Sequence, residues 1–105
     1  MNVIFSPEAS EYLADLIEIL YDNDYLGFKD SAKKYVEELV INIKISINNK
    51  SKKKAPAYFN RYGKGLYYAV FKKNDNTQWY VFFNYEDDIY YIRYIGNNHT
   101  CAQYL

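Results

Sequence analysis

The chain has 105 residues, a length typical of one domain and too short for a second independent core. Half of its residues are apolar, and 14 Tyr, 6 Phe and one Trp bring the aromatic share to 20%, which excludes a disordered chain. The 13 basic and 13 acidic residues cancel, so the total charge indicates no polyanionic partner. We therefore expect a single folded domain over residues 1–105.

The charges are nevertheless segregated along the chain. Residues 1–38 contain nine acids and three lysines, residues 39–74 contain nine basic residues and no acid, and residues 75–105 contain four acids and one arginine. A basic segment of this kind attracts phosphates over roughly a Debye length. Its lysines would equally protect a loop and an edge strand from aggregation, so both interpretations stay open.

The chain shows no sign of export. Its one cysteine, Cys101, cannot form an internal disulfide, and the opening Met1-Asn2-Val3-Ile4-Phe5 lacks the basic region and long apolar core of a signal peptide. No stretch approaches the run of about 18 apolar residues that a membrane helix needs. We expect a cytoplasmic protein that does not interact with membranes.

The amino-terminal half predicts a strand and two helices. Asn2–Phe5 favours a strand, and Ser6-Pro7 is typical of a helix start. The apolar stripe of the first helix is Ala9, Tyr12, Leu13, Leu16, Ile17 and Leu20. Asp22-Asn23-Asp24 and Gly27 break it, Asp30-Ser31 can cap a second helix, and the second stripe is Ala32, Tyr35, Val36, Leu39, Val40 and Ile43. The isoleucines from Ile41 to Ile47 also alternate in strand period, but no breaker interrupts the stripe, so we predict a helix there.

The carboxyl-terminal half predicts a loop and three strands. Asn48–Lys54 is polar and basic, with Pro56 following, which favours an exposed loop. Strands are predicted at 66–73, 78–84 and 89–95, joined by turn sequences. The order β-α-α-β-β-β predicts an α+β fold in which a helical hairpin packs on one face of a small antiparallel sheet and the other face stays partly open.

Few residues suggest catalysis. His99 is the only histidine and suits general acid or base work at neutral pH, although a lone histidine in a polar tail is more often ordinary surface. The chain lacks a second His or Cys cluster at ligand spacing, so we expect no metal, and it lacks a phosphate loop or dinucleotide motif, so we expect no cofactor. Cys101 is expected to be a buried thiol. Ten of the 14 tyrosines follow Lys54 and could either stack on splayed bases or pack the sheet.

The chain resembles the RelE/ParE superfamily of toxins from bacterial toxin-antitoxin pairs. The resemblance rests on the element order, the size, the opening Ile4-Phe5-Ser6-Pro7-Glu8-Ala9, and the close Tyr91-Ile92-Arg93-Tyr94-Ile95-Gly96-Asn97-Asn98-His99 followed by Tyr104. It implies a small toxin of a type II system that its antitoxin neutralises, and commonly an endonuclease that cuts mRNA on the ribosome. Other members of the superfamily poison DNA gyrase.

The resemblance also implies site residues. Tyr104 matches a carboxyl-terminal tyrosine that RelE-type ribonucleases use at the scissile phosphate, and Arg61 with Lys64 falls where the family places basic residues before the second strand. Asn98-His99 and Tyr67 stand where the nucleases often have arginine, although some members use a histidine near this end. The expected catalytic residues are His99, Tyr104 and Arg61, and the expected substrate-binding residues are Lys64, Lys53, Lys54, Tyr67 and Arg93.

These residues suggest metal-independent cleavage by attack of a ribose 2′-OH on the neighbouring phosphorus. Arg61 and Lys64 would hold the phosphate, His99 would transfer the proton, and Tyr104 would orient the substrate or share the acid role. The absent arginines favour a gyrase inhibitor without catalysis. The neutral net charge favours a degenerate toxin that binds only its antitoxin and operator DNA.

An antitoxin protein is the expected partner in every case, with mRNA and the ribosome, or gyrase, as targets. The acidic amino-terminal segment should repel RNA and leave that side for the antitoxin. Charge reversal at Glu11, Asp15 and Glu18 is therefore expected to weaken antitoxin binding more than nuclease activity.

Overall fold

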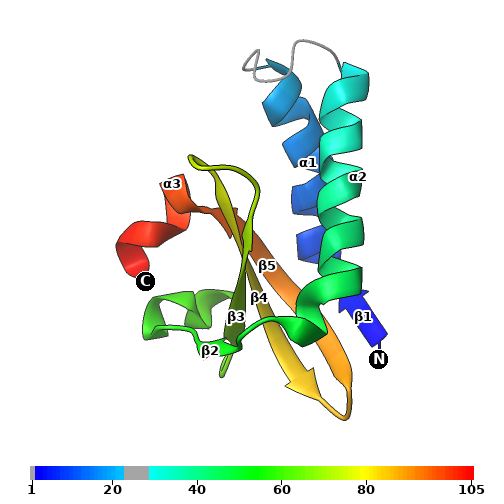
Figure 1. Cartoon of the computed structure of the whole chain (residues 1–105). Helices are drawn as coiled ribbons and strands as arrows, with labels where there is room; N and C mark the ends of the chain where they lie inside the picture. Colours follow the sequence, from blue (N-terminus) through cyan, green and yellow to red (C-terminus); the bar gives the residue numbers. More distant parts are fainter. Residues whose placement is uncertain (1, 23–28) are drawn as a thin grey trace.

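The computed structural model describes residues 2–22 and 29–105, so the expected helix break at Asn23-Asp24 and Gly27 lies outside the described residues. Two long helices lie on one side of a sheet, and short helical segments lie on the other side (Figure 1). The elements in chain order are β1 Asn2–Phe5, α1 Pro7–Asp22, α2 Lys29–Ser46, η1 Ile47–Asn49, β2 Lys53–Lys54, η2 Ala57–Tyr62, β3 Tyr67–Lys72, β4 Gln78–Glu86, β5 Ile89–Asn97, α3 Asn98–Cys101 and η3 Ala102–Tyr104.

The sheet has five strands in the order β1-β5-β4-β3-β2. The predicted meander of β3, β4 and β5 is confirmed, with antiparallel pairing and bounds within two residues of those expected. The expectation of a purely antiparallel sheet is wrong, because β1 pairs with β5 in parallel and makes the sheet mixed. More than 80 residues separate Phe5 from Ile89, so no hairpin fixes the direction of β1, and the long crossover permits a parallel pair.

The first helix begins as its sequence predicts. The Ala9 amide donates a hydrogen bond of 3.0 Å to Ser6 Oγ, and Ser6 itself is buried. Pro7 is the first residue of α1 and Glu8 lies in the first turn, where a carboxylate is favoured by the helix dipole. The chain therefore leaves the edge strand β1 and turns back over the sheet within one residue.

The ambiguous isoleucine run is helical, as predicted. The second helix continues to Ser46, and Ile43 and Ile47 are fully buried while Ile41 and Ile45 are exposed. The helix starts at Lys29, one residue before the expected cap at Asp30. The hydrophobic stripe therefore outweighed the strand-like alternation, because it lets α2 pack against both α1 and the sheet.

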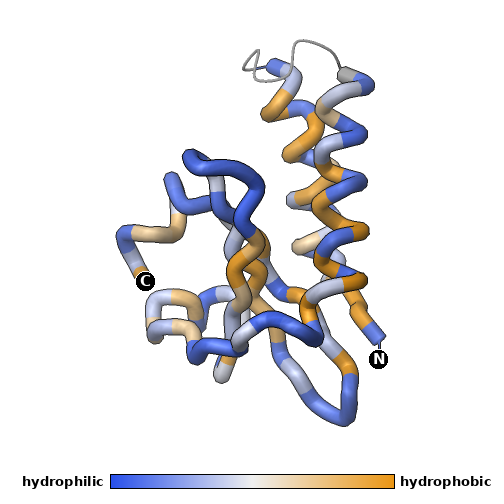
Figure 2. Tube along the Cα trace, in the orientation of Figure 1, coloured by the Kyte–Doolittle hydropathy of each residue, from blue (hydrophilic) through white to orange (hydrophobic). Residues whose placement is uncertain are grey.

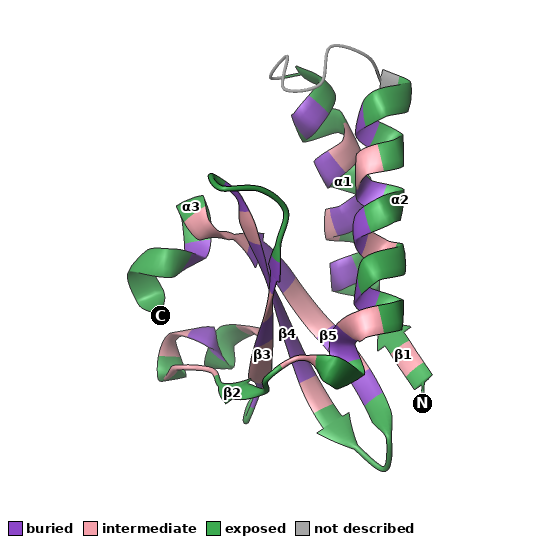
Figure 3. Cartoon of the chain, viewed as in Figure 1, coloured by how far each residue is buried: buried purple, intermediate pink, exposed green. Residues whose placement is uncertain are grey.

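The helix face of the sheet, covered by α1 and α2, carries the larger core. Apolar side chains of both helices pack with alternate residues of the strands. Hydrophobic and buried positions recur along both helices and alternate with hydrophilic and exposed ones (Figures 2 and 3). The strand residues fully buried in this core include Ala69, Phe71, Trp79, Val81, Phe83, Tyr90, Ile92 and Ile95. The alternation along β4 places Trp79, Val81 and Phe83 on this face.

The opposite face, which we call the aromatic face, is more covered than its sequence predicts. Phe59 of η2 and Cys101 of α3 pack on Leu66, Tyr80 and Phe82 and form a second buried cluster. Two segments expected to be irregular therefore have structure: the polar tail contains α3, and Lys53–Lys54 forms the short edge strand β2 in place of a loop. The backbone of β2 pairs with β3, and Cys101 of α3 packs on Tyr80 and Phe82 of β4, which are long-range partners that the local composition does not reveal.

Cys101 is buried, as expected, and burial raises the pKa of its thiol. No helix within residues 2–22 and 29–105 has the length and apolarity that crossing a membrane requires.

Candidate nucleic-acid interface

An irregularity in the sheet directs Arg93 toward η2. Phe82 pairs with Tyr94 and Phe83 pairs with Ile92, so Arg93 is the extra residue of a β-bulge in β5. Bulges re-aim side chains and occur often beside functional sites. Arg93 Nε donates a hydrogen bond of 3.3 Å to the carbonyl oxygen of Tyr62. A methyl group at Gly63 would lie 3.4 Å from Arg93 Nε, within van der Waals contact, so the guanidinium lies close to this part of the backbone.

Arg61 reaches the same region from η2. Its Nε donates a hydrogen bond of 2.9 Å to the carbonyl oxygen of Tyr58, and its Cζ lies 3.7 Å from the centre of the Tyr58 ring. Residues three apart in a 3-10 helix lie on the same side, which explains why Arg61 covers Tyr58. Both arginines therefore have Nε fixed by a backbone carbonyl, and within residues 2–22 and 29–105 no hydrogen bond is found for their terminal amines.

The two guanidinium groups line one hollow. This arginine hollow has a volume of about 190 Å³ and is lined by Glu8, Arg61, Tyr62 and Arg93. Among the described residues, no carboxylate oxygen lies within 4.0 Å of either guanidinium. The ion pairs found among these residues join Lys72 with Asp75 and Lys73 with Glu38, and neither includes an arginine. Two guanidiniums against one carboxylate give the arginine hollow a net positive charge.

A pair of parallel tyrosine rings adjoins the arginine hollow. Tyr58 and Tyr104 stack with ring centres 3.6 Å apart and an interplanar angle of 4°. Because Arg61 lies equally close to the Tyr58 ring, the two groups must occupy opposite faces of that ring. A hydrogen bond to Tyr104 raises the pKa of the Tyr58 hydroxyl, so this phenol stays protonated at neutral pH. The Tyr58–Tyr104 pair, which we call the tyrosine stack, joins η2 to the exposed carboxyl-terminal segment.

Further ring contacts hold η2 on the aromatic face. Phe59 stacks on Phe82 at 4.3 Å, and Tyr62 stacks on Tyr94 at 3.8 Å with an interplanar angle of 1°. Burial and a hydrogen bond to Tyr62 raise the pKa of Tyr94 far above its usual range. The position of Arg61 therefore depends on rings packed to either side of it.

The structure brings three of the predicted site residues together, namely Arg61, Arg93 and Tyr104, through the arginine hollow and the tyrosine stack. Lys64 is exposed in the connection that follows η2, and its carbonyl accepts a hydrogen bond from Asn84 Nδ2. Lys53 and Lys54 are exposed on β2. Tyr67 packs its ring toward Phe83 on the helix face, on the opposite side of the sheet from the tyrosine stack.

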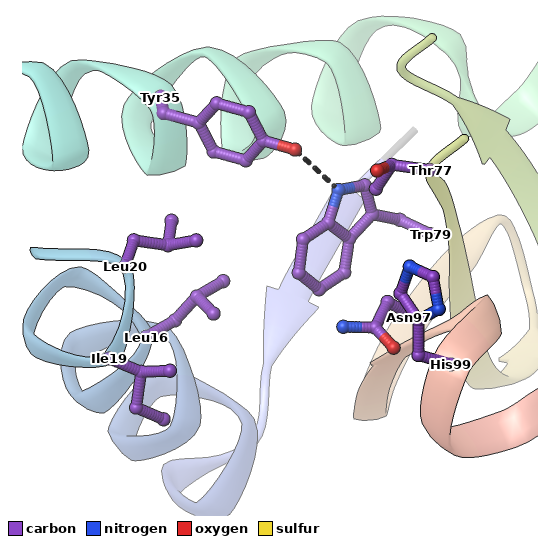
Figure 4. A pocket seen from close by; sticks show the side chains of 8 residues that line it. All are labelled: Leu16, Ile19, Leu20, Tyr35, Thr77, Trp79, Asn97 and His99. Carbon is purple, nitrogen blue, oxygen red and sulfur yellow. Dashed lines mark hydrogen bonds between the residues drawn. The ribbon is translucent and has the colours of Figure 1, made fainter. Parts of the chain in front are cut away.

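His99 lies in a different place. It lines a second hollow of about 170 Å³ between α1 and the end of the sheet, together with Leu16, Ile19, Leu20, Tyr35, Thr77, Trp79 and Asn97 (Figure 4). We call this the helix-end hollow. None of the other predicted site residues lines it. The single imidazole is therefore part of a site separate from the two arginines.

The remaining cations of the basic segment are dispersed. Lys50 lies over the Phe71 ring and Lys73 over the Tyr35 ring, both on the helix face, and Lys52 lies over Tyr85 and Tyr90. The uninterrupted run of positive charge in the sequence thus corresponds to several separate contacts in the structure. Arg61 is the only cation of this segment that lines the arginine hollow.

Sequence reasoning missed three residues of the site. Glu8 was named only as part of the opening motif, and Tyr58 and Tyr62 were not distinguished from the other tyrosines that follow Lys54. The recurrence of Tyr58, Arg61 and Tyr62 at spacings of three and four is the signal that could have placed them on one side of a short helix. No sequence signal connects Glu8 with Arg93, because the sheet pairing brings them together.

No group of three or more His, Cys, Asp or Glu side chains in the described part of the chain is close enough to hold a metal ion. The chemistry of the arginine hollow is that of an anion site: two planar fork-like donors that match phosphate oxygens, one carboxylate and one phenol. No protein-family model, no curated protein and no solved structure matches the chain.

Proposed function

We propose that this protein is the toxin of a type II toxin-antitoxin pair of the RelE/ParE superfamily, acting as a metal-independent endoribonuclease on mRNA at the ribosome. The observation that carries the proposal is the arginine hollow: Arg61 and Arg93 share one cavity, and no carboxylate within 4.0 Å neutralises them among the described residues. An RNA phosphodiester supplies the anion that this arrangement lacks. The adjoining tyrosine stack supports the proposal, since exposed aromatic rings bind unpaired bases.

The residues of the arginine hollow suggest a division of roles. Arg61 and Arg93 bind the scissile phosphate and stabilise the additional negative charge as the 2′-oxygen attacks phosphorus. Glu8, the carboxylate of this hollow, accepts the 2′-hydroxyl proton, a role that sequence reasoning assigned to His99. The bond from phosphorus to the 5′-oxygen breaks, and that oxygen takes a proton from water. Tyr104 orients a base through the tyrosine stack, and Lys53, Lys54 and Lys64 contact more distant phosphates.

The test is to add the purified protein to translating ribosomes and to map mRNA ends. We expect Arg61→Ala and Arg93→Ala each to slow cleavage by about 10²- to 10³-fold, as removal of a transition-state donor does. Glu8→Gln keeps the shape of the side chain and is expected to slow cleavage by about 10²-fold or more, as loss of a general base does. Transcripts that remain intact with the unaltered protein would refute the nuclease.

Two control variants separate local from general effects. Lys34→Ala removes an exposed cation from α2, far along the chain from the arginine hollow, and is expected to cleave normally. His99→Ala tests the helix-end hollow, and we expect it to retain cleavage within about threefold, a change too small for loss of an acid or base. A large loss of RNA cleavage in His99→Ala would indicate that His99 transfers the proton and would refute the role of Glu8.

One observation favours a second function, the non-catalytic inhibition of DNA gyrase. The only imidazole of the chain lies in the helix-end hollow, so the arginine hollow has no group that titrates near neutral pH among its lining residues. Such a hollow could bind an acidic protein target without cleaving anything. A supercoiling assay with purified gyrase distinguishes the two: inhibition together with intact mRNA supports the second function, and unaffected supercoiling removes it.

A further inference from the structure

The aromatic face is exposed at the hairpin that joins β4 to β5 (Figure 3). Side chains alternate between the two faces along each strand, and Phe83 and Tyr90 are buried under the helices. Residues an odd number of positions away along each strand therefore lie on the aromatic face, and toward the hairpin these are Asn84, Glu86, Ile89 and Tyr91. In the strand pairing Asn84 lies opposite Tyr91, and Glu86 lies opposite Ile89. None of the four belongs to the buried cluster that η2 and α3 complete on this face.

These side chains and one from the turn line a hollow. This hairpin hollow has a volume of about 220 Å³ and is lined by Asn84, Glu86, Asp87, Ile89 and Tyr91. The turn Asp87-Asp88 has two residues, both with positive φ, as a tight type I′ turn requires. Strand pairing and the tight turn therefore hold the walls of the hairpin hollow in place. An aromatic ring and an aliphatic side chain come from β5, and an amide and two carboxylates come from β4 and the turn.

The hairpin hollow adjoins the arginine hollow through Arg93. The guanidinium of Arg93 lines the arginine hollow, and its Cζ lies 5.3 Å from the centre of the Tyr91 ring. Tyr91 and Arg93 are two residues apart on β5, about 7 Å along the strand. A phosphate held by Arg93 and a flat group held against Tyr91 would therefore be neighbours, as the phosphate and the base of one nucleotide are. The tyrosine stack adjoins the arginine hollow through Arg61 instead, so the hairpin hollow is a separate place for a base.

The carboxylates of the hairpin hollow distinguish between bases. An ionised carboxylate accepts hydrogen bonds and donates none. Guanine alone among the four RNA bases has two adjacent donors on its Watson–Crick edge, namely N1–H and the N2 amine. Adenine, cytosine and uracil place an acceptor beside each donor, and a carboxylate would repel that acceptor. Because the two oxygens of one carboxylate can accept hydrogen bonds side by side, guanine is the base that the hairpin hollow fits.

We propose that the hairpin hollow binds a guanine base of the RNA substrate, with Glu86 accepting hydrogen bonds from N1–H and the N2 amine and with Tyr91 contacting the flat face of the base. The volume of about 220 Å³ suffices, since a cavity of roughly 150 Å³ holds benzene and a purine adds one smaller ring. Arg93 holds the phosphate of the same nucleotide, so cleavage falls beside guanines. The choice of RNA as the ligand rests on the proposed ribonuclease.

The test measures binding of fluorescent oligonucleotides to the full chain by anisotropy. Each probe is a short 2′-deoxy strand, which lacks the attacking hydroxyl and stays intact, and carries one guanine, inosine, adenine or cytosine among uracils. We expect the guanine probe to bind about 5- to 100-fold more tightly than the adenine or cytosine probe, as a bidentate contact to a base edge discriminates by about this much. Inosine keeps N1–H but lacks the N2 amine, so the affinity of its probe should lie in between.

Variants of the chain assign the contacts. Glu86→Gln keeps the shape of an exposed side chain but replaces one acceptor oxygen by a donor amide, so it should leave the melting temperature unchanged and reduce the guanine preference to within about threefold. Tyr91→Ala should weaken binding of every probe about fivefold or more, since stacking tolerates any base, whereas Tyr91→Phe keeps the ring and should not. The matched control is Asp75→Asn, which removes an exposed carboxylate from the turn between β3 and β4 and should keep the full guanine preference.

Three results would overturn the proposal. Equal binding of all probes would remove the base preference, and a guanine preference that persists in Glu86→Gln would remove the role of this carboxylate. An arginine-containing peptide that binds more tightly than the guanine probe, and no longer binds Glu86→Gln, would identify a guanidinium of a protein as the occupant. Mapping of mRNA ends keeps this question separate from the ribonuclease: cleavage without regard to guanine refutes only the guanine site, and guanine-selective binding with intact mRNA refutes only the nuclease.

Discussion

The two faces of the sheet bury different kinds of side chain. The helix face buries mainly aliphatic side chains from two long amphipathic helices, whereas the aromatic face is covered by short segments held by stacked rings. Aliphatic packing of this kind depends on periodic pattern and total volume. Ring stacking depends on individual orientations. Arg61 and Arg93 lie on the aromatic face. Each donates a hydrogen bond to a backbone carbonyl and lies over a neighbouring tyrosine ring, and these contacts fix its orientation.

Adjacent phenylalanines in β4 allow this difference to be measured. Phe82 faces the aromatic cluster and Phe83 faces the helices, and both are fully buried. We expect Phe82→Ala and Phe83→Ala each to lower the free energy of unfolding by about 3 to 5 kcal/mol, as removal of a buried ring does. Chemical denaturation measures both losses. Only Phe82 stacks on η2, through Phe59, so only its loss should release that segment.

The release of η2 is tested in the milder variants Phe82→Leu and Phe83→Leu, which keep most of the buried volume. We expect faster proteolysis within residues 57–62 and weaker RNA binding in Phe82→Leu alone. If η2 resisted proteolysis equally well in both leucine variants, the stacked rings would not be what positions Arg61. The proposed contrast between the two faces would then be refuted.

The return of the chain over the aromatic face depends on Gly96. A methyl group at Gly96 would overlap Cys101 Sγ and approach the Tyr94 ring, so Gly96→Ala must displace α3. We expect a loss of about 3 kcal/mol in the free energy of unfolding, the upper range for overpacking. The matched control is Gly65→Ala, where nothing lies within 4 Å and only the positive φ of 65° opposes the substitution. A larger loss in the control would show that backbone strain, and not contact with Cys101, decides the outcome.

The sequence predicts the helix face of the sheet better than the aromatic face. The apolar stripes of α1 and α2 and the three strands were predicted to within two residues, because burial on one side leaves a period in the sequence. The cap at Ser6 was likewise readable, since a hydroxyl before Pro7 has a local structural meaning.

The candidate site was only partly predictable. Arg61, Arg93 and Tyr104 were singled out, but their proximity depends on a bulge, on strand pairing and on ring stacking between residues far apart in the chain. His99 was expected beside them, and the structure places it in a hollow with Leu16 and Trp79, because it lies at the start of α3, directly after β5 ends, while Tyr104 lies farther along on the aromatic face. Long-range pairing of this kind leaves no period in a single sequence, so the parallel strand β1 and the role of Glu8 were also missed.

Tyr12 lies where the two faces meet and gives a pH-dependent test. Burial, followed by the nearby Cys101, raises the pKa of Tyr12 to about 12 from its usual value of 10.0. Below pH 10 the phenol is protonated in both native and unfolded chains, so it adds no pH dependence. Between pH 10 and 12 only the unfolded chain releases the proton, so the free energy of unfolding should fall by about 2 kcal/mol across this window.

Alkaline denaturation curves check this expectation. Tyr12→Phe has no proton to release and should flatten the decline between pH 10 and 12, whereas Tyr21→Phe removes an exposed phenol from the same helix and serves as the control. If the free energy of unfolding fell equally steeply in Tyr12→Phe and in the unaltered chain, the Tyr12 hydroxyl would not be shielded from water where its ring packs against Tyr94.

The smallest expected effect separates the two possible roles of Tyr104. Its ring stacks on the Tyr58 ring, so we expect Tyr104 to serve as a platform for a base and not as the proton donor. Tyr104→Phe keeps the ring and should change the free energy of unfolding by less than about 1 kcal/mol, the usual net contribution of one hydrogen bond, with RNA cleavage within about threefold. Tyr104→Ala removes the platform and should weaken RNA binding, since stacking of a base contributes about 1 to 3 kcal/mol.

A loss of cleavage of about 10²-fold in Tyr104→Phe, with stability unchanged, would instead identify the hydroxyl as the general acid. The tyrosine stack would then belong to the catalytic groups, and the aromatic face would supply proton transfer as well as position.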